Sequence, residues 1–379
     1  MSNNNLTKAK AAKNDEFYTQ YEDIESEMNA YLEYDPDLFR GKTVLCPCDD
    51  PDFSNFTRYF AAKFESLGLK KLISTSYARD SKPYKAGTQI SMFELNSPNY
   101  DEAKTNTHGK IFVLEHDEDG SGNIDIDDLR WEYLDGDGDF RSEEVKALRD
   151  EADFIITNPP FSLFREFLAW ITEGGKKFAI IGNMNAITYK EVFPLIKDNG
   201  IWLGCSIHSG DRAFNVPDTY ELSAAGCGFD EKGRKFIRVK GVRWFTNIEH
   251  GRRHQPMLLM TEKDNIKYSK HKQVKGIGYL RYDNYDAIEV PFSDAIPKDY
   301  PGVMGVPISW LDKYCPEQFE IADLNPHFFS IVTKGLPKPD QLHLKNAGLK
   351  DPYARVLIRY TDSWKASHPD IFNTTESED

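Results

Sequence analysis

The sequence predicts an α/β fold in which a mostly parallel sheet wrapped by helices is followed by a mixed, mostly β region. Up to about residue 200, apolar runs of strand length alternate with segments of helical periodicity, which is the pattern of a parallel sheet. Beyond residue 200 the apolar runs are short and aromatic, and turn residues separate them. A chain of 379 residues has room for both parts.

A polar arm over residues 1–14 opens the chain, and we expect it to be flexible. The sheet domain is expected over residues 15–200. Ligands of such sheets bind at the carboxyl ends of the strands, so the loops after Leu45 and Ile156 are expected to carry the chemistry. The predicted strands are 42–46, 71–75, 153–157 and 178–182, and the predicted helices are 24–34, 56–67, 162–172 and 189–197.

The second part is expected over residues 201–360, with strands at 241–245, 278–282 and 287–290. Residues 361–379 are polar and acidic, and we expect them to form a flexible tail. Apolar residues make up 40% of the whole chain, which is enough for a core in each part.

Charge is distributed unevenly along the chain, whose net charge is −14. Residues 1–200 contain 23 basic and 37 acidic side chains, whereas residues 201–360 contain 23 basic and 19 acidic ones. The most basic stretch, residues 228–275, holds 13 basic and 5 acidic side chains. Because phosphates are neutralised locally, a basic face on an acidic protein can bind DNA, although a solvated lysine-rich surface has the same composition.

The composition also bears on the compartment. No apolar run is long enough to span a membrane, and the N-terminus has no apolar signal region, so we expect a cytoplasmic protein. The five scattered cysteines favour reduced thiols over a disulfide framework. Cys46-Pro-Cys48 lacks the second pair of ligands that a zinc site needs.

The strongest functional motif is Asn158-Pro159-Pro160-Phe161, which follows an apolar strand and precedes a helix. The exocyclic amine of adenine is a poor nucleophile because its lone pair is delocalised into the ring. The Asn158 side-chain carbonyl and the Pro159 main-chain carbonyl can accept its two hydrogens and turn the lone pair towards a methyl donor. The prolines hold the backbone rigid, and Phe161 offers a face for an extruded base.

Two other interpretations of this motif stay open. A Pro-Pro turn can end a strand with Phe161 packed in the core. The same type of loop also occurs in enzymes that methylate RNA or the glutamine side chains of proteins. The motif therefore indicates the amino-methyl chemistry more strongly than it indicates the substrate.

With this loop, the chain resembles the EcoRI-type adenine-specific DNA methyltransferases from about residue 8 to about residue 360. The resemblance implies a Rossmann-like methyltransferase fold, S-adenosylmethionine as the methyl donor, a flipped-out adenine of double-stranded DNA as the substrate, and target recognition by residues 201–360. The matching stretches are Asn14–Tyr21, Cys48–Pro51, Ser54–Phe56, Gly68–Ile73, Gly138–Ser142, Thr157–Phe164, Thr188–Phe193, Ile201–Gly204, Tyr282–Ile288 and Gly302–Pro307.

The same resemblance implies which residues bind the cofactor. The glycine-rich first loop that is usual in the wider superfamily is absent after Leu45, and no clear acid ends the second strand to hold the ribose. The implied contacts are Phe17, Tyr18 and Thr19 at the methionine end, Cys48, Asp49 and Asp50 in the first cofactor loop, and Asp139 and Phe140 at the adenine.

An acidic insertion over about 115–135 has the ligand spacing of an EF-hand calcium loop, with Gly122 at the sharp turn. Its twelfth position is Asp rather than Glu, and a strand rather than a helix precedes it. A structural calcium ion and a solvated acidic turn both stay open. The candidate ligands are Asp117, Asp119, Ser121, Asn123 and Asp128.

Arg252, Arg253 and His254 lie in the basic stretch beside aromatic strands, and we expect them to contact DNA; a surface loop with ordinary ion pairs is the alternative. The sequence thus predicts a site-specific adenine methyltransferase that works as a monomer, either with a separate cognate restriction endonuclease or alone. The alternatives are an RNA or protein-glutamine methyltransferase and a catalytically silent DNA-binding relative.

Overall fold

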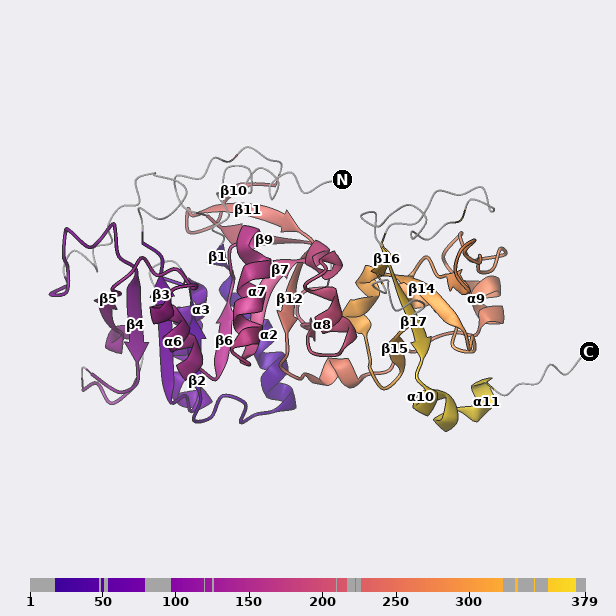
Figure 1. Cartoon of the computed structure of the whole chain (residues 1–379), viewed down its shortest axis with the longest axis horizontal. Helices are drawn as coiled ribbons and strands as arrows, with labels where there is room; N and C mark the ends of the chain where they lie inside the picture. Colours follow the sequence, from indigo (N-terminus) through magenta and orange to yellow (C-terminus); the bar gives the residue numbers. More distant parts are fainter. Residues whose placement is uncertain are drawn as a thin grey trace, which may run out of the picture. The chain divides into compact units, whose positions relative to one another are not determined.

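The computed structural model describes residues 18–47, 49–50, 54–78, 97–118, 120–124, 126–208, 210–216, 222, 226–322, 331–332, 344 and 354–372. The chain folds as two compact units (Figure 1). Unit 1 comprises Met1–Met184 and Leu203–His250, and unit 2 comprises Asn185–Trp202 and Gly251–Asp379. The predicted flexible arm, residues 1–14, lies outside the described residues.

The core of unit 1 is an eight-stranded sheet with the strand order β5-β4-β3-β2-β6-β7-β12-β8. The four strands predicted for the first part are confirmed as β3, β2, β6 and β7, and they pair in parallel at the centre of the sheet. The strands are β2 (Thr43–Cys46), β3 (Lys71–Ser76), β4 (Lys110–Leu114), β5 (Arg130–Tyr133), β6 (Phe154–Thr157), β7 (Lys177–Asn183), β8 (Trp202–Leu203) and β12 (Val242–Thr246).

Strand β12 corrects the expected division of the chain. The sequence pattern predicts this strand within a second, mostly β part, but it pairs antiparallel with β7, with Val242 opposite Asn183. All five residues of β12 are buried. A strand that is buried on both faces suits the interior of a helix-covered sheet, and this packing places residues 203–250 in unit 1.

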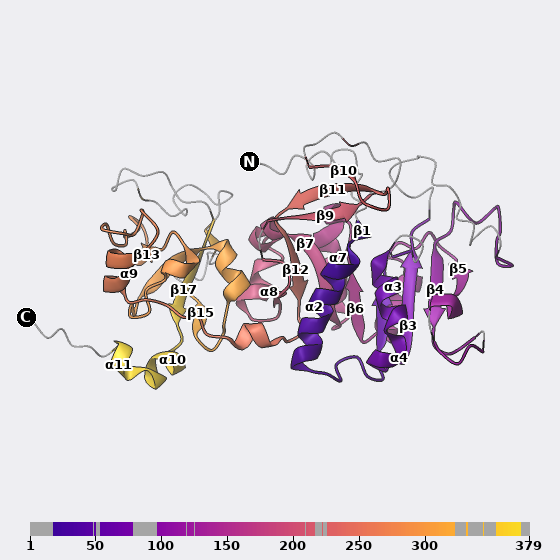
Figure 2. The same ribbon diagram turned by 180° about the vertical axis from the view of Figure 1, so that it is seen from behind.

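Helices cover both faces of the sheet. Helices α6 and α7 lie on one face, and α2, α3 and α4 lie on the other (Figures 1 and 2). The predicted helix 56–67 is interrupted at Lys63, and the helix predicted at 162–172 opens with a 3-10 turn, η3. The bounds are α2 (Tyr21–Tyr34), α3 (Asn55–Ala62), α4 (Phe64–Leu67), η2 (Ile126–Asp128), α6 (Glu143–Glu151), η3 (Phe161–Leu163), α7 (Phe164–Glu173) and η4 (Met184–Thr188).

These helices form where the sequence supplies a cap and an apolar face. The Ser54 hydroxyl caps α3 by accepting from the Phe56 amide, and the Ser142 hydroxyl caps α6 by accepting from the Val145 amide. The buried positions of α7 recur at spacings of three and four residues, which turns one stripe of that helix to the sheet. They are Phe164, Phe167, Leu168, Trp170 and Ile171.

A smaller antiparallel sheet with the order β1-β9-β11-β10 completes unit 1. In both views it lies across one end of the central strands (Figures 1 and 2). Its first strand comes from the N-terminal segment, where Tyr18 pairs with Asn215. The strands are β1 (Tyr18–Thr19), β9 (Asp211–Asn215), β10 (Gly228–Phe229) and β11 (Lys235–Lys240).

Unit 2 contains a sheet with the order β13-β14-β17-β15, in which β16 also pairs with β17. The predicted strand 278–282 is represented only by a bridge between Arg281 and Ile288. The elements are α8 (Phe193–Lys197), η5 (Gly251–His254), α9 (Glu262–Tyr268), β13 (Ala287–Glu289), η6 (Ser293–Ala295), β14 (Val303–Pro307), η7 (Ile308–Lys313), β15 (Phe319–Ile321), β16 (Ile331–Val332), β17 (Arg355–Tyr360), α10 (Asp362–Ser367) and α11 (Pro369–Phe372).

The segment predicted as a flexible acidic tail begins with ordered structure. Thr361 caps α10 through its hydroxyl, and the ring of Phe372 packs 5.2 Å from that of Tyr360. Residues 373–379 lie outside the described residues. Across the described residues, no helix is both long and apolar enough to cross a membrane.

Candidate functional site

The carboxyl ends of β2, β3 and β6 meet at one edge of the central sheet, where the sequence predicts the chemistry. Cys46, the last residue of β2, lies opposite Ser74 of β3, and Thr157 is the last residue of β6. The loop after β2 turns over this edge, because the Asp49 amide donates to the Thr75 carbonyl at 2.6 Å. Three loops therefore converge around Asp49.

The Asp49 side chain points into the protein rather than towards solvent. It is 6% exposed, and its Oδ1 accepts from the Ser54 hydroxyl at 2.6 Å. Its Oδ2 lies 2.5 Å from the Thr157 hydroxyl. Burial raises the pKa of the Asp49 carboxyl to about 7; the two hydroxyl contacts oppose this shift, and the neighbouring charge of Asp50 adds to it.

Hydroxyl groups also hold the main chain at Asp49. The Ser74 hydroxyl donates to the Asp49 carbonyl, and the Thr57 hydroxyl lies 2.8 Å from Ser74 Oγ and 3.3 Å from the same carbonyl. Ser74 and Thr57 are fully buried. The site predicted from the sequence did not include Ser74, Thr57, Ser54 or Thr157. Only Ser54 had a signal in the sequence, because a serine directly before a helix is a typical helix cap.

The predicted catalytic loop lies directly after Thr157. Asn158 is half-buried, and its Oδ1 atom is shielded from solvent. Pro159 is buried, and Pro160 holds φ at −54° and starts a turn in which its carbonyl accepts from the Leu163 amide at 2.9 Å. Phe161 is half-buried against the main apolar cluster of unit 1. The motif thus occupies the strand-to-helix position that its chemistry requires.

Strand β1 brings the N-terminal segment to the same edge. The Asn55 amide group at the start of α3 donates to the Thr19 carbonyl at 2.7 Å, and the Gln20 amide group donates to Asn215 at 2.9 Å. Thr19 is 2% exposed, and its hydroxyl has no hydrogen-bond partner among the described residues. A buried hydroxyl that lacks a partner is costly unless a ligand supplies one.

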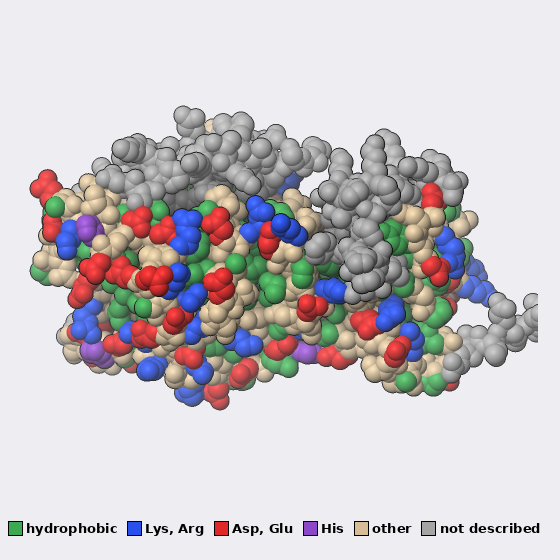
Figure 3. Space-filling model, viewed as in Figure 1, with side chains coloured by type: hydrophobic (Ala, Val, Ile, Leu, Met, Phe, Trp, Pro, Cys, Tyr) green, Lys and Arg blue, Asp and Glu red, His purple; other side chains and the backbone are tan. Residues whose placement is uncertain are grey.

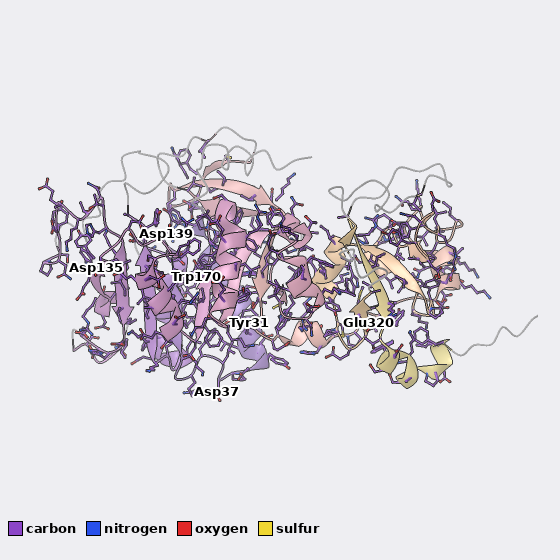
Figure 4. The ribbon with its side chains drawn as sticks, in the orientation of Figure 1. Tyr31, Asp37, Asp135, Asp139, Trp170 and Glu320 are labelled. Atoms are coloured by element: carbon purple, nitrogen blue, oxygen red, sulfur yellow. The ribbon has the colours of Figure 1, made fainter. Side chains whose placement is uncertain are left out.

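The predicted loop at Asp139 approaches the end of β3. Gly138 has φ +82°, and a Cβ there would lie 2.4 Å from the Ser76 carbonyl oxygen, so only glycine fits this close approach. Asp139 lies at the upper edge of the sheet in Figure 4. Hydrogen bonds from Arg141, at 2.9 Å for Nε, lower the pKa of the Asp139 carboxyl, which therefore stays ionised.

Phe140 differs from the expected adenine contact, because it is 3% exposed and packs in an aromatic cluster. Its ring centroid lies 5.1 Å from that of Phe167 and 5.7 Å from that of Trp170, both on α7. We therefore assign Phe140 to the packing of its loop on α7. Asp50 is half-buried on the first loop, and Phe17 and Cys48 lie outside the described residues.

The residues at this edge fit the chemistry of S-adenosylmethionine, which carries an ammonium, a sulfonium and hydrogen-bonding groups on ribose and adenine. Asp139 supplies an ionised carboxylate at the edge, and the Thr19 hydroxyl is a buried donor and acceptor. These groups and the catalytic loop surround the carboxyl ends of three adjacent strands. The arrangement suits methyl transfer to an amine held by the loop.

The acidic insertion does not form the predicted calcium site in the described residues. The Asp117 carboxylate accepts from the amides of Gly120 and Gly122, each at 2.7 Å, and Asp128 is buried and accepts from the Glu118 amide at 2.7 Å. The Ser121 hydroxyl donates to the Asn123 carbonyl at 3.0 Å. No metal-binding group of His, Cys, Asp or Glu occurs in the described residues, and Asp119 lies outside them.

The predicted DNA contacts lie in η5 of unit 2 and differ from one another. Arg253 is 3% exposed; its guanidinium donates to Asn199 and lies 3.8 Å from the ring centroid of Trp202. A buried arginine that stacks on a tryptophan stabilises the fold and is not placed to reach a phosphate. His254 pairs with Glu317 at 2.7 Å, and Arg252 is half-buried.

A family model and three relatives match the sequence of this chain. The family model described as "Adenine-specific methyltransferase EcoRI" matches residues 5–361. The Type II methyltransferase M.EcoRI of Escherichia coli is 41% identical over 358 residues, which cover 94% of this chain and 97% of that protein. The Type II methyltransferase M.MpnI of Mycoplasma pneumoniae is 33% identical over 360 residues, which cover 93% of this chain and 97% of that protein.

A third relative extends the same pattern. The Type II methyltransferase M.MgeORF184P of Mycoplasma genitalium is 31% identical over 360 residues, which cover 93% of this chain and 98% of that protein. No solved structure matches the chain significantly. The similarity to these relatives therefore spans both units rather than the catalytic loop alone.

Proposed function

The chain belongs to the EcoRI family of adenine-specific methyltransferases, and we propose that it transfers a methyl group from S-adenosylmethionine to the exocyclic amine of a flipped-out adenine in double-stranded DNA. The observation that carries this proposal is the position of Asn158–Phe161 at the carboxyl end of β6, beside the loop that follows β2. The mostly parallel centre of the sheet supports a Rossmann-like methyltransferase fold for unit 1.

In this mechanism the catalytic loop positions the target amine. The Asn158 side-chain oxygen and the Pro159 carbonyl accept the two amine hydrogens, which directs the nitrogen lone pair out of the plane of the base. Phe161 stacks on the extruded ring. The nitrogen held in this way would accept the methyl group, and its extra proton would leave to water.

The cofactor supplies an electrophilic methyl group on a sulfonium when it is bound. Thr19, Asp50 and Asp139 would hold it: the Thr19 hydroxyl gains the hydrogen-bond partner that it lacks among the described residues, and a carboxylate accepts from an ammonium or an amine. Tyr18 lies next to Thr19 on β1 and completes this side of the site. No general base is required, because the proton is lost after the transfer.

Asn158 provides the direct test of this function. Labelled methyl transfer from S-adenosylmethionine to unmethylated DNA is measured for the wild type and for Asn158→Ala, with RNA and unfolded protein as alternative acceptors. The proposal predicts labelled DNA for the wild type and a loss of about 10²–10³-fold in kcat for the variant. Labelling of RNA or protein instead of DNA would replace the substrate, and an active variant would exclude the loop.

We further propose that unit 2 recognises the DNA target through the segment around α9. Lys263, Lys267, Lys272 and Lys275 are exposed there, and among the described residues none of them pairs with a carboxylate. Figure 3 shows lysine and arginine side chains gathered over the part of unit 2 that contains α9. These lysines suit phosphate contacts better than Arg253 does, because their charges face solvent.

The names of the relatives suggest a partner enzyme for this protein. The relatives are named Type II methyltransferases, which fits a role beside a separate restriction endonuclease of the same specificity. A single catalytic loop with its own recognition unit in one chain fits a monomeric enzyme, and we propose that it works in the cytoplasm. Size-exclusion chromatography with light scattering, with and without DNA, would test the monomer.

A further inference from the structure

We infer that Asp49 is a neutral carboxylic acid in the working enzyme and that it positions the catalytic loop by donating its proton to the hydroxyl of Thr157. This inference deepens the proposed function, on which its catalytic part rests. It assigns to Asp49 an internal role in place of the direct cofactor contact expected from the sequence.

The Thr157 hydroxyl faces two oxygens but has a single hydrogen. It lies 2.8 Å from the Pro47 carbonyl oxygen and 2.5 Å from Asp49 Oδ2. The Pro47 carbonyl can only accept a hydrogen bond, and an ionised Asp49 could also only accept. One hydrogen cannot serve both acceptors fully. If Asp49 carries a proton, it donates to Thr157, and Thr157 donates to Pro47.

The contacts of Asp49 Oδ1 agree with a proton on Oδ2. Ser54 donates to Asp49 Oδ1 at 2.6 Å and accepts from the Phe56 amide at 3.1 Å, so its hydroxyl is used in both directions. Asp49 therefore accepts on Oδ1 and donates from Oδ2. Every hydrogen in the chain of contacts from Phe56 to Pro47 then has one donor and one acceptor, as buried polar groups require.

The surroundings of Asp49 favour the neutral form. The groups that face it are the hydroxyls of Ser54 on α3 and Thr157 on β6, and the buried Cys46 thiol at the end of β2. From β3, the Ser74 hydroxyl donates to the main-chain carbonyl of Asp49. Among the described residues, the charge that acts on it is the like charge of Asp50, and the raised pKa of Asp49 agrees with this setting.

The hydrogen bond between Asp49 and Thr157 affects catalysis because Thr157 is the neighbour of Asn158 in the chain. Thr157 directly precedes Asn158, so the contact fixes the end of β6 from which the catalytic loop starts. Ionisation of Asp49 would draw the Thr157 hydrogen towards Oδ2 and leave the buried Pro47 carbonyl without that hydrogen bond. Asp49 and Thr157 are thus positioning residues, which act on the reaction through Asn158.

Asparagine mimics the proposed state, because its amide donates where the acid donates and its carbonyl accepts where the acid accepts. We expect wild-type kcat to fall as the pH rises through about 7, the pKa of Asp49. Asp49→Asn should lack this fall and keep at least tenfold more kcat than Asp49→Leu. Asp153→Asn, at the opposite end of β6, is the matched control and should keep the wild-type pH profile.

Two further measurements keep the inference testable if Asp49→Leu does not fold. Thr157→Val should lower kcat more than it weakens S-adenosylmethionine binding, and Thr157→Ser should restore kcat. NMR of protein labelled with ¹³C at aspartate Cγ measures the titration of the Asp49 carboxyl without an activity assay. The Asp49 signal is assigned by its loss in Asp49→Asn. An Asp49 carboxyl that titrates near pH 4, or a pH profile that Asp49→Asn leaves unchanged, would overturn the inference. A wild type that methylates no DNA while Asp49 titrates near 7 would instead contradict the proposed function alone.

Discussion

At the scale of single residues, the site is built from short polar side chains around the ends of three strands. Asp49, Ser54 and Thr157 join the cofactor loop, the start of α3 and the catalytic loop through two hydrogen bonds. The contact with Ser54 is local, whereas the contact with Thr157 joins residues 108 positions apart in the sequence. In the proposed function, Asp49 therefore links the segment expected to hold the methyl donor to the loop expected to hold the acceptor.

Thr19→Val tests the cofactor role of a single hydroxyl. Valine has nearly the same shape, so β1 should stay paired with β9, while the hydrogen bond offered to the ligand is lost. We expect the Kd for S-adenosylmethionine to rise about fivefold to tenfold, which corresponds to a hydrogen bond of about 1 kcal/mol. Isothermal titration calorimetry measures this change. An unaltered Kd would remove Thr19 from the cofactor site.

Arg253→Ala tests the structural assignment of the buried arginine. Loss of the stack on Trp202 and of the bond to Asn199 should lower the stability of the protein by about 1–3 kcal/mol. Arg252→Ala is the neighbouring control and should change stability by less than about 0.5 kcal/mol. Chemical denaturation compares the variants. Weak DNA binding by Arg253→Ala without any loss of stability would restore the role first predicted for it.

At the scale of elements, sequence periodicity predicted the centre of unit 1 well. The runs that became β2, β6 and β7 are mainly apolar, and β3 adds Leu72 and Ile73, which is typical of strands covered on both faces. The position of the Asn158–Phe161 loop between a strand and a helix was predictable as well, whereas its catalytic role stays a prediction. These features depend on neighbours along the chain.

Other elements could not be predicted because distant residues decide them. β12 has the aromatic character of the second part, but its pairing with β7 places it in the central sheet. The inward direction of Asp49 depends partly on the Thr157 hydroxyl of β6, which no local pattern connects to it. Likewise, the stacking of Arg253 on Trp202 requires residues 51 positions apart to meet.

The acidic insertion offers a test at the same scale. Asp117 accepts from three loop amides, including that of Ser121 at 3.2 Å, so it acts as a cap for the turn. Asp117→Ala should lower the stability by about 1 kcal/mol, equally in calcium and in chelator. Thermal unfolding in both solutions measures the effect. A loss confined to calcium would revive the EF-hand interpretation.

At the scale of the whole molecule, an acidic chain binds a polyanion through a local concentration of basic side chains. The net charge of −14 opposes non-specific binding, so the contacts that we propose for unit 2 would have to outweigh it. The match of the family model from residue 5 to residue 361 spans both units of the chain.

The salt dependence of DNA binding tests the recognition surface of the whole protein. Each lysine that contacts a phosphate contributes about 0.9 to the slope of log K against log salt concentration. Replacement of Lys263, Lys267, Lys272 and Lys275 by glutamine should lower the slope by up to about 3.6 and weaken all DNA sequences alike. The same number of lysines replaced in unit 1, such as Lys42, Lys63, Lys70 and Lys146, forms the control. An equal slope in both variants would place the DNA elsewhere.

The most direct test of the central claim is to incubate the purified protein with unmethylated genomic DNA and S-adenosylmethionine and to map modified bases by sequencing. We expect N6-methyladenine within one short recurring sequence, and none when Asn158→Ala is used. Methylation of cytosine, or no DNA methylation by a protein that binds S-adenosylmethionine, would contradict the assignment of Asn158–Phe161 as an adenine-methylating loop.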